Sequence, residues 1–109
     1  MVAPLRRVIV KRPQEAFLND AAIESQWRQL AYLRPPNLQR CIQDHERFVS
    51  LLRRAGAEVL HLPSDPRTGL DSLYVHDPLL ITDTGAIIFQ TGKPARQGEG
   101  PVFTDALRK

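Results

Sequence analysis

Two short apolar runs, each followed by a proline, predict two strands, one near each end of the first half of the chain. The β-branched run at 8–10 lies between arginines and is followed by Pro13, which predicts a buried strand from Arg6 to Lys11. The run at 58–62, closed by Pro63, predicts a second strand. With a helix between them, the two strands are expected to be parallel, and the helix to cover one face of the sheet.

Two helices are predicted between these strands. Apolar residues recur at helical spacing from Asp20 to about Ala31, where Asn19 or Asp20 can cap the start and Pro35-Pro36 follows the end. The clearest helix opens at Asn37 and stops at Gly56. Its apolar face consists of Leu38, Cys41, Ile42, His45, Phe48, Val49, Leu52 and Ala55, and polar residues cover the rest.

The second half of the chain is richer in turns. Residues 73–75 are expected to be extended, and the apolar runs 79–82 and 86–89 flank a turn at 83–85, which predicts an antiparallel hairpin. Parallel and antiparallel strands together predict an α/β fold with a mixed sheet and one long covering helix. The tail beyond Pro101 starts a helical pattern that the chain ends before completing more than about two turns.

Size and composition predict a single globular domain over residues 1–109. The apolar fraction is 42% and the charged fraction 25%, values typical of soluble proteins. No apolar run approaches the roughly 18 residues of a membrane span, and the start does not resemble a secretory signal. One cysteine excludes an internal disulfide and fits a reducing compartment. We therefore expect a cytoplasmic protein with no membrane partner.

The net charge of +3 and the isoelectric point near 9.5 raise the question of nucleic-acid binding. Cations cluster at 6–7 and 11–12, but the others are spread among acids, and aromatic and basic residues do not interleave. A solvated basic surface explains the charge, and no nucleic-acid partner is expected.

The candidate chemistry is concentrated between residues 71 and 99. A guanidinium is planar and always protonated, so a site that holds one needs carboxylates that match its fork of N–H donors. Asp71 and Asp77 are six residues apart, so an extended segment between them would place both side chains on one side. A planar bidentate donor such as Arg96 suits a ligand carboxylate better than lysine does. Each has a simpler interpretation: Asp71 and Asp77 as turn residues, and Arg96 as a solvated loop residue.

Four segments carry a resemblance to a known family: residues 6–10, 44–59, 71–78 (DSLYVHDP) and 92–99 (GKPARQGE). The last two are specific together. The chain resembles the N-terminal part of a dimethylarginine dimethylaminohydrolase or a closely related arginine-deiminase-like hydrolase of the guanidino-group-modifying superfamily. The resemblance spans nearly all of this chain but well under half of a family member. It implies part of a pentein α/β propeller, about two ββαβ-like modules.

The resemblance also implies roles for particular residues. Asp77 corresponds to the acid that binds the substrate guanidinium, Asp71 to a second acidic contact, and Arg96 to the arginine that holds the substrate α-carboxylate. His76 stands where dimethylarginine hydrolases usually have glutamate, and it is a further candidate contact, pH-sensitive by nature. Leu18, or its neighbour Phe17, lies where a mobile substrate-covering loop would begin.

In the family a cysteine thiolate attacks the guanidinium carbon, a histidine transfers protons, and a citrulline-type product is released. Both residues belong to a later part of the fold, so no catalytic residue is predicted in this chain. Cys41 lies on the apolar helix face, where a buried thiol has a raised pKa. Cys41, His45 and His61 could share a metal, but no CxxC or HxxxH pair supports one. No metal or cofactor is therefore expected.

Two functions from different classes remain. In the first, the chain is the substrate-recognition portion of a cysteine-dependent amidine hydrolase acting on an arginine-like guanidine, and it is inactive by itself. In the second, it is a truncated binding or self-assembly module whose exposed sheet edges favour a homo-oligomer or a complementing C-terminal half.

Overall fold

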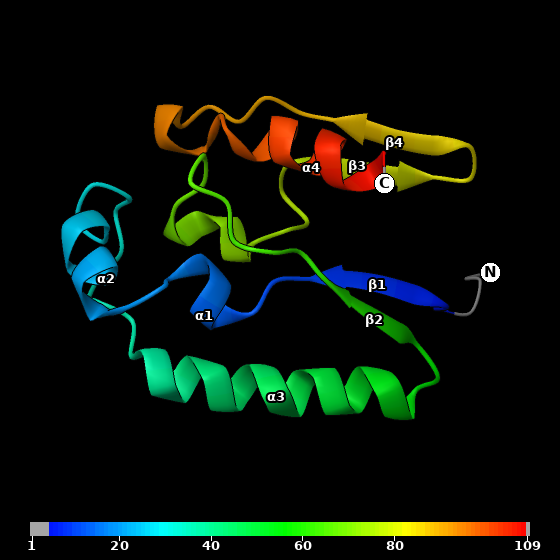
Figure 1. Ribbon diagram of the computed structural model, residues 1–109, viewed down its shortest axis with the longest axis horizontal. Coiled ribbons are helices and arrows are strands. Elements are labelled where there is room, and N and C mark those ends of the chain that lie inside the picture. The colour runs from blue at the N-terminus through cyan, green and yellow to red at the C-terminus, as the bar shows by residue number, and fades with distance from the viewer. Residues whose placement is uncertain (1–4, 109) are drawn as a thin grey trace.

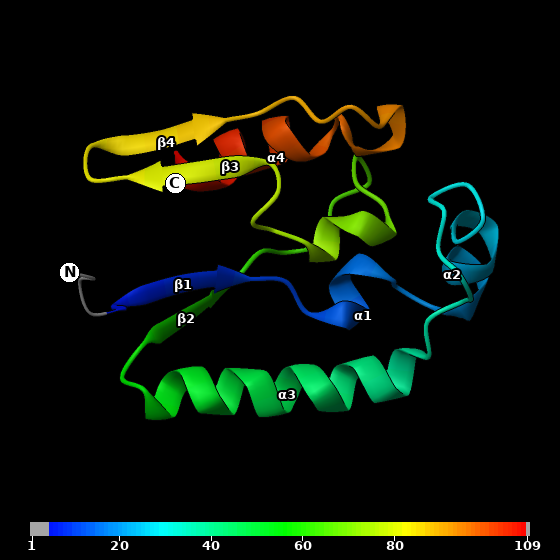
Figure 2. The same ribbon diagram turned by 180° about the vertical axis from the view of Figure 1, so that it is seen from behind.

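The computed structural model describes residues 5–108 as a parallel strand pair followed by an antiparallel hairpin, with helices around both. Figures 1 and 2 show the long helix on one side of the parallel pair and the hairpin with the last helix on the other. The elements in chain order are β1 (Arg7–Val10), α1 (Pro13–Ala16), α2 (Asp20–Gln26), α3 (Leu38–Arg54), β2 (Glu58–His61), the 3₁₀ helix η1 (Leu70–Leu73), β3 (Leu79–Thr82), β4 (Gly85–Ile88), the 3₁₀ helix η2 (Pro94–Arg96) and α4 (Glu99–Leu107).

The predicted parallel pair is confirmed. β1 and β2 pair in parallel, with Val8 opposite Val59 and Val10 opposite His61. The connection between them carries α3, which begins after Asn37, whose side chain accepts a hydrogen bond from the backbone N–H of Arg40 at 2.9 Å. It ends before Gly56, which has φ +90° and therefore supplies the left-handed conformation that terminates a helix.

α2 is shorter than predicted. Its start is capped as expected, because the Asn19 side chain accepts a hydrogen bond from the Ala22 N–H at 2.8 Å. It ends at Gln26 rather than near Ala31, since Ala31 adopts φ 65° and the Tyr32 N–H bonds to the carbonyl of Trp27. The apolar residues that continue the helical spacing are thus held by a turn.

The expectation of one mixed sheet was wrong. Within residues 5–108, β1 pairs only with β2 and β3 pairs only with β4, so the chain forms two separate two-stranded sheets. The hairpin itself is antiparallel as predicted, with Leu79 opposite Ile88, but its turn is Asp83-Thr84 and Gly85 already lies in β4. The two sheets meet through side chains instead of backbone hydrogen bonds. Leu62, Val102 and Phe103 are buried between them, with Ile9 and Ile88 packed against this cluster.

The extended segment expected at 73–75 was also wrong. Residues 70–73 form η1, followed by turns, because local hydrogen bonds satisfy the backbone here. The Ser72 hydroxyl donates to the carbonyl of Gly69 at 2.7 Å, and the Tyr74 N–H donates to the carbonyl of Asp71 at 3.0 Å. Short polar side chains that bond to nearby backbone favour such turns over strands. Period-two alternation therefore does not relate Asp71 to Asp77.

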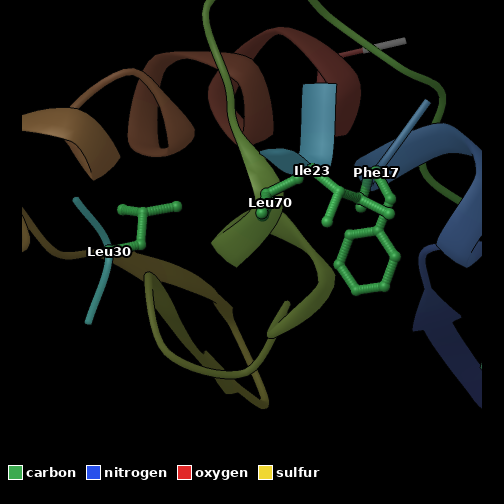
Figure 3. Packing of buried hydrophobic residues seen from close by; sticks show 5 residues of the cluster. Phe17, Ile23, Leu30 and Leu70 are labelled. Carbon is green, nitrogen blue, oxygen red and sulfur yellow. The ribbon is translucent and has the colours of Figure 1, made fainter. Parts of the chain in front are cut away.

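The buried core that supports η1 lies between α1, α2 and η1. Its members are Ala16, Phe17, Ile23, Leu30 and Leu70, and Figure 3 shows the labelled side chains gathered around Leu70. Leu70 is completely buried, and its N–H also donates to the Gln26 side chain at 3.1 Å. Asp71 follows Leu70 directly, so the packing of Leu70 fixes the position of the Asp71 backbone. No helix within residues 5–108 has the length and apolar character to cross a membrane.

Candidate functional site

The buried side chain of Arg96 joins three elements at the centre of the candidate site. Its Nη1 donates to Oδ2 of Asp77 at 2.8 Å, and its Nη2 donates to the carbonyl of Asp71 at 3.2 Å. Its Nε and Nη2 also bond to the two carboxylate oxygens of Glu99, at 2.9 and 2.8 Å. This fork-to-fork arrangement is the geometry in which arginine and carboxylate interact most strongly. Arg96 thereby ties η2 to α4 and to the segment around η1.

Glu99 is the partner that sequence reasoning missed. It is the first residue of α4, and its side chain is only 4% exposed. A buried carboxylate is tolerated here because it is paired with Arg96 and lies at a helix N-terminus, where negative charge is favoured. Hydrogen bonding to Glu99, and then to Asp77, raises the pKa of Arg96 further above its usual range. The i,i+3 spacing within GKPARQGE was the available signal.

The Asp71 carboxylate is paired with a lysine. Its side chain is 5% exposed, and its Oδ2 accepts a hydrogen bond from Nζ of Lys93 at 3.2 Å. Nε of Arg96 lies 4.0 Å from the same oxygen. Lys93 also donates to the carbonyl of Leu30 at 3.1 Å, which anchors the lysine over the turn after α2. The Tyr32 phenol lies close to the same carboxylate, which adds to the effect of burial in raising the pKa of Tyr32.

A shallow, open pocket of about 390 Å³ lies beside Asp71. Its walls combine one carboxylate, two cations and two phenols: Leu30, Ala31, Tyr32, Leu33, Arg34, Asp71, Tyr74 and Lys93. Such a lining presents opposite charges at short range. The arrangement can hold a small zwitterion, with its cation on Asp71 and its anion on Lys93 or Arg34.

Tyr32 is a second residue that the sequence did not indicate. Its hydroxyl is buried and has no hydrogen-bond partner among the described residues. Burial, and then the nearby Asp71, raise the pKa of Tyr32 far above its usual range, so the phenol stays protonated. A protonated phenol can donate a hydrogen bond to a ligand. Because Tyr32 lies in the turn after α2, only the folded chain brings it to Asp71.

The remaining predicted site residues are more exposed. Asp77 is 38% exposed, and its Oδ1 lies 2.9 Å from Nε2 of His76, which is itself 80% exposed. Neither residue lines the Asp71 pocket. Leu18 lies between α1 and α2 and is 55% exposed. Its φ of 65° is uncommon for a residue other than glycine. The structure thus brings Asp71, Asp77 and Arg96 together and places His76 beside Asp77, whereas Leu18 is not among the residues that line the Asp71 pocket.

Arg96 differs most from expectation. A residue that holds a ligand carboxylate needs free N–H donors, yet this guanidinium is buried and bonded to two carboxylates and to the backbone. It could accept a ligand carboxylate only by releasing one of its present partners. In this arrangement Arg96 positions Asp77 and the Asp71 backbone.

The cysteine and histidines considered for a metal do not form a cluster of metal ligands. No group of three or more histidine, cysteine or acidic side chains is suitably placed within residues 5–108. Burial raises the pKa of Cys41. The rings of His45 and His61 are tilted against each other, with centroids 5.7 Å apart.

Comparison with known proteins identifies proteins that are similar to this chain. The chain matches no protein-family model. It is 28% identical over 79 residues to N(G),N(G)-dimethylarginine dimethylaminohydrolase of Pseudomonas aeruginosa, a match that covers 72% of this chain and 31% of that protein. The chain therefore spans about a third of the length of this curated relative.

Solved structures agree in fold. A dimethylarginine dimethylaminohydrolase adduct with 4-chloro-2-hydroxymethylpyridine has a TM-score of 0.72 at 24% identity, covering 95% of this chain and 36% of that one. A cysteine-to-serine variant of the Pseudomonas aeruginosa enzyme complexed with citrulline has a TM-score of 0.74 at 23% identity, covering 97% and 38%. The expected resemblance is confirmed, and the fold is that of part of an α/β pentein propeller. The division into about two ββαβ-like modules stays a prediction.

Proposed function

From the similarity of this chain to part of dimethylarginine dimethylaminohydrolase, we propose that it forms the substrate-recognition portion of an amidine hydrolase acting on arginine, a methylated arginine or a similar guanidine. The observation that carries this proposal is the Asp71 carboxylate, almost fully buried and facing a pocket that also contains Lys93. The citrulline complex of the structural relative supports the same ligand class.

The pocket matches the two ends of such a ligand. The guanidinium donates to the Asp71 carboxylate, whose burial strengthens a charge-assisted hydrogen bond. The ligand carboxylate pairs with Lys93 or Arg34, which line the same pocket. Asp77 does not line this pocket, so in this proposal it contacts the ligand only if the ligand extends beyond the pocket toward Arg96 and His76. Arg96 positions the Asp77 carboxylate and the Asp71 backbone, and Leu18 borders the segment that would cover the ligand.

No turnover is proposed for this chain alone. Its single cysteine, Cys41, lies on α3, where burial raises the pKa of the thiol and keeps it protonated. Thiolate attack on a guanidinium carbon would therefore require a cysteine that this sequence does not contain. The chain should bind a guanidine without converting it.

Guanidine recognition is tested by titration calorimetry with arginine, dimethylarginine and citrulline. We expect Asp71→Asn to weaken binding of arginine about tenfold or more, because the amide keeps the shape but removes the charge. Asp83→Asn, which makes the same charge change in the exposed hairpin turn, is the matched control. A circular dichroism spectrum confirms that each variant is folded.

Two results would contradict the proposal. The first is arginine binding that Asp71→Asn leaves unchanged. The second is citrulline formation by the purified chain, because it would require a nucleophile that we do not assign.

A second function is favoured by the apolar surface of the hairpin. Leu80, Ile81, Ile87 and Phe89 are all between 46% and 62% exposed, and the two separate sheets leave strand edges unpaired within residues 5–108. Exposed apolar patches and open edges are typical of association surfaces. In this alternative the chain is a self-assembly module, or it pairs with a complementing partner through the hairpin.

Self-association predicts a concentration-dependent dimer or larger species in sedimentation velocity. Ile81→Lys should shift the population to monomer, because a charge cannot be buried in an apolar interface. Leu33→Lys is the control, since Leu33 is fully exposed and distant in sequence from the hairpin. A chain that sediments as a monomer at every concentration would rule out this alternative.

A further inference from the structure

A basic pocket, separate from the Asp71 site, is lined by residues next to and within α1, by α3 and by the end of β2. Its volume is about 580 Å³, and it is lined by Arg12, Gln14, Ile42, His45, Glu46, Val49, Ser50, Arg53, Arg54 and His61. It shares no residue with the Asp71 pocket. Its size is that of a small-metabolite site.

Charge in this pocket is unbalanced. Three arginines face one glutamate, and none of Arg12, Arg53 and Arg54 forms an ion pair or a side-chain hydrogen bond within residues 5–108. Arg53 and Arg54 also complement the C-terminal end of α3. Arg12 cannot stabilise a helix C-terminus, because it precedes α1. Folding brings it to the same pocket as Arg53 and Arg54.

Two histidines complete the pocket. The His45 and His61 rings are 5.7 Å apart, and Nε2 of His45 is buried without a hydrogen-bond partner among the described residues. Burial, and then the positive charge of Arg12, lower the pKa of both histidines. Glu46 partly opposes this shift for His45, and Arg53 lowers the pKa of His61 further. Burial and the positive charge of Arg12 therefore favour the neutral form of both rings.

We infer that this pocket is a binding site for a small phosphate-type oxyanion, held by Arg12, which precedes α1, and by Arg53 and Arg54 at the end of α3. Arginine guanidinium groups match the geometry of phosphate oxygens and bind them through paired N–H donors. The bound anion supplies the negative charge that the pocket lacks. The inference does not depend on the proposed guanidine site.

The pH dependence of binding follows from the histidines. Their pKa values in the free protein are lowered, so both are largely neutral near pH 7 and gain protons as the pH falls below the ordinary histidine value of about 6.5. Each proton adds positive charge beside the anion. Anion affinity should therefore increase as the pH is lowered, and bound anion should raise the pKa of both histidines.

The test uses pyrophosphate and sulfate titrations of the whole chain at constant ionic strength. We expect Arg12→Ala to weaken pyrophosphate binding about tenfold, the effect of losing one charge-assisted contact. Arg47→Ala is the matched control, because it removes the same charge from α3 outside the pocket. Sulfate keeps a constant charge across the pH range, so its tighter binding at lower pH reports the protein, and His61→Gln should reduce that pH dependence.

Several results would overturn the inference. Equal losses in the Arg12→Ala and Arg47→Ala variants would show general charge attraction instead of a site. So would an RNA oligonucleotide that binds more tightly than pyrophosphate and is weakened equally by both substitutions. Absence of pyrophosphate binding by the folded wild-type chain would refute it directly.

Discussion

Replacing Arg96 by alanine is expected to reduce the free energy of unfolding by about 3–5 kcal/mol, the cost of removing one partner from a buried ion pair. The substitution leaves the Glu99 side chain, 4% exposed, without its counter-charge, and it frees Asp77 from η2. Urea unfolding followed by circular dichroism measures the change. Small domains have little stability in reserve, so the loss is a large share of the total.

Two further variants separate the charge from the fork of donors. Arg96→Lys should recover part of the stability, because the ammonium restores the charge but cannot bond to both oxygens of Glu99 while also reaching Asp77. Glu99→Gln added to Arg96→Ala should also recover part of it, since it removes the uncompensated charge. Arg28→Ala, which breaks the exposed pair with Glu24, is the control and should cost less than about 1 kcal/mol. Equal effects of Arg96→Ala and Arg28→Ala would show that the Arg96 cluster does not stabilise the fold.

Replacing Phe103 by alanine should cost about 3–5 kcal/mol, the range for truncating a buried aromatic side chain. Phe103 is 2% exposed and packs with Leu62 and Val102 where the two sheets meet. No backbone ladder links these sheets within residues 5–108, so side-chain packing has to hold them together. The same unfolding measurement applies, and hydrogen exchange should show the hairpin amides losing protection first.

Leu107→Ala provides the matched control on the same helix. Leu107 is 42% exposed, so its truncation removes little buried surface and should cost well under half as much. If the two truncations had similar effects, the cluster around Phe103 could not be the main link between the hairpin and the parallel pair.

Local sequence patterns predicted part of the candidate site. The sequence singled out residues 71–78 and 92–99, and the fold brings these segments into contact through Arg96. The reason offered for Asp71 and Asp77 lying on one side was wrong, because η1 and the turns after it replace the extended segment and period-two alternation does not apply. What brings Asp77 and Asp71 together is a guanidinium from a distant part of the chain. The roles of these residues toward a ligand stay predictions.

Local physical chemistry determined the elements whose signals are short-range. Asn37 caps α3 and Gly56 ends it, and the apolar runs of β1 and β2 are short and lie on either side of this helix. The sequence alone therefore predicted a parallel strand pair covered by a long helix. Tertiary structure decided which polar groups pair. Tyr32 and Lys93 meet Asp71 only after folding, and packing around Phe103 holds the two separate sheets together. Contacts between distant residues depend on the whole packed arrangement, and no periodicity within one segment encodes them.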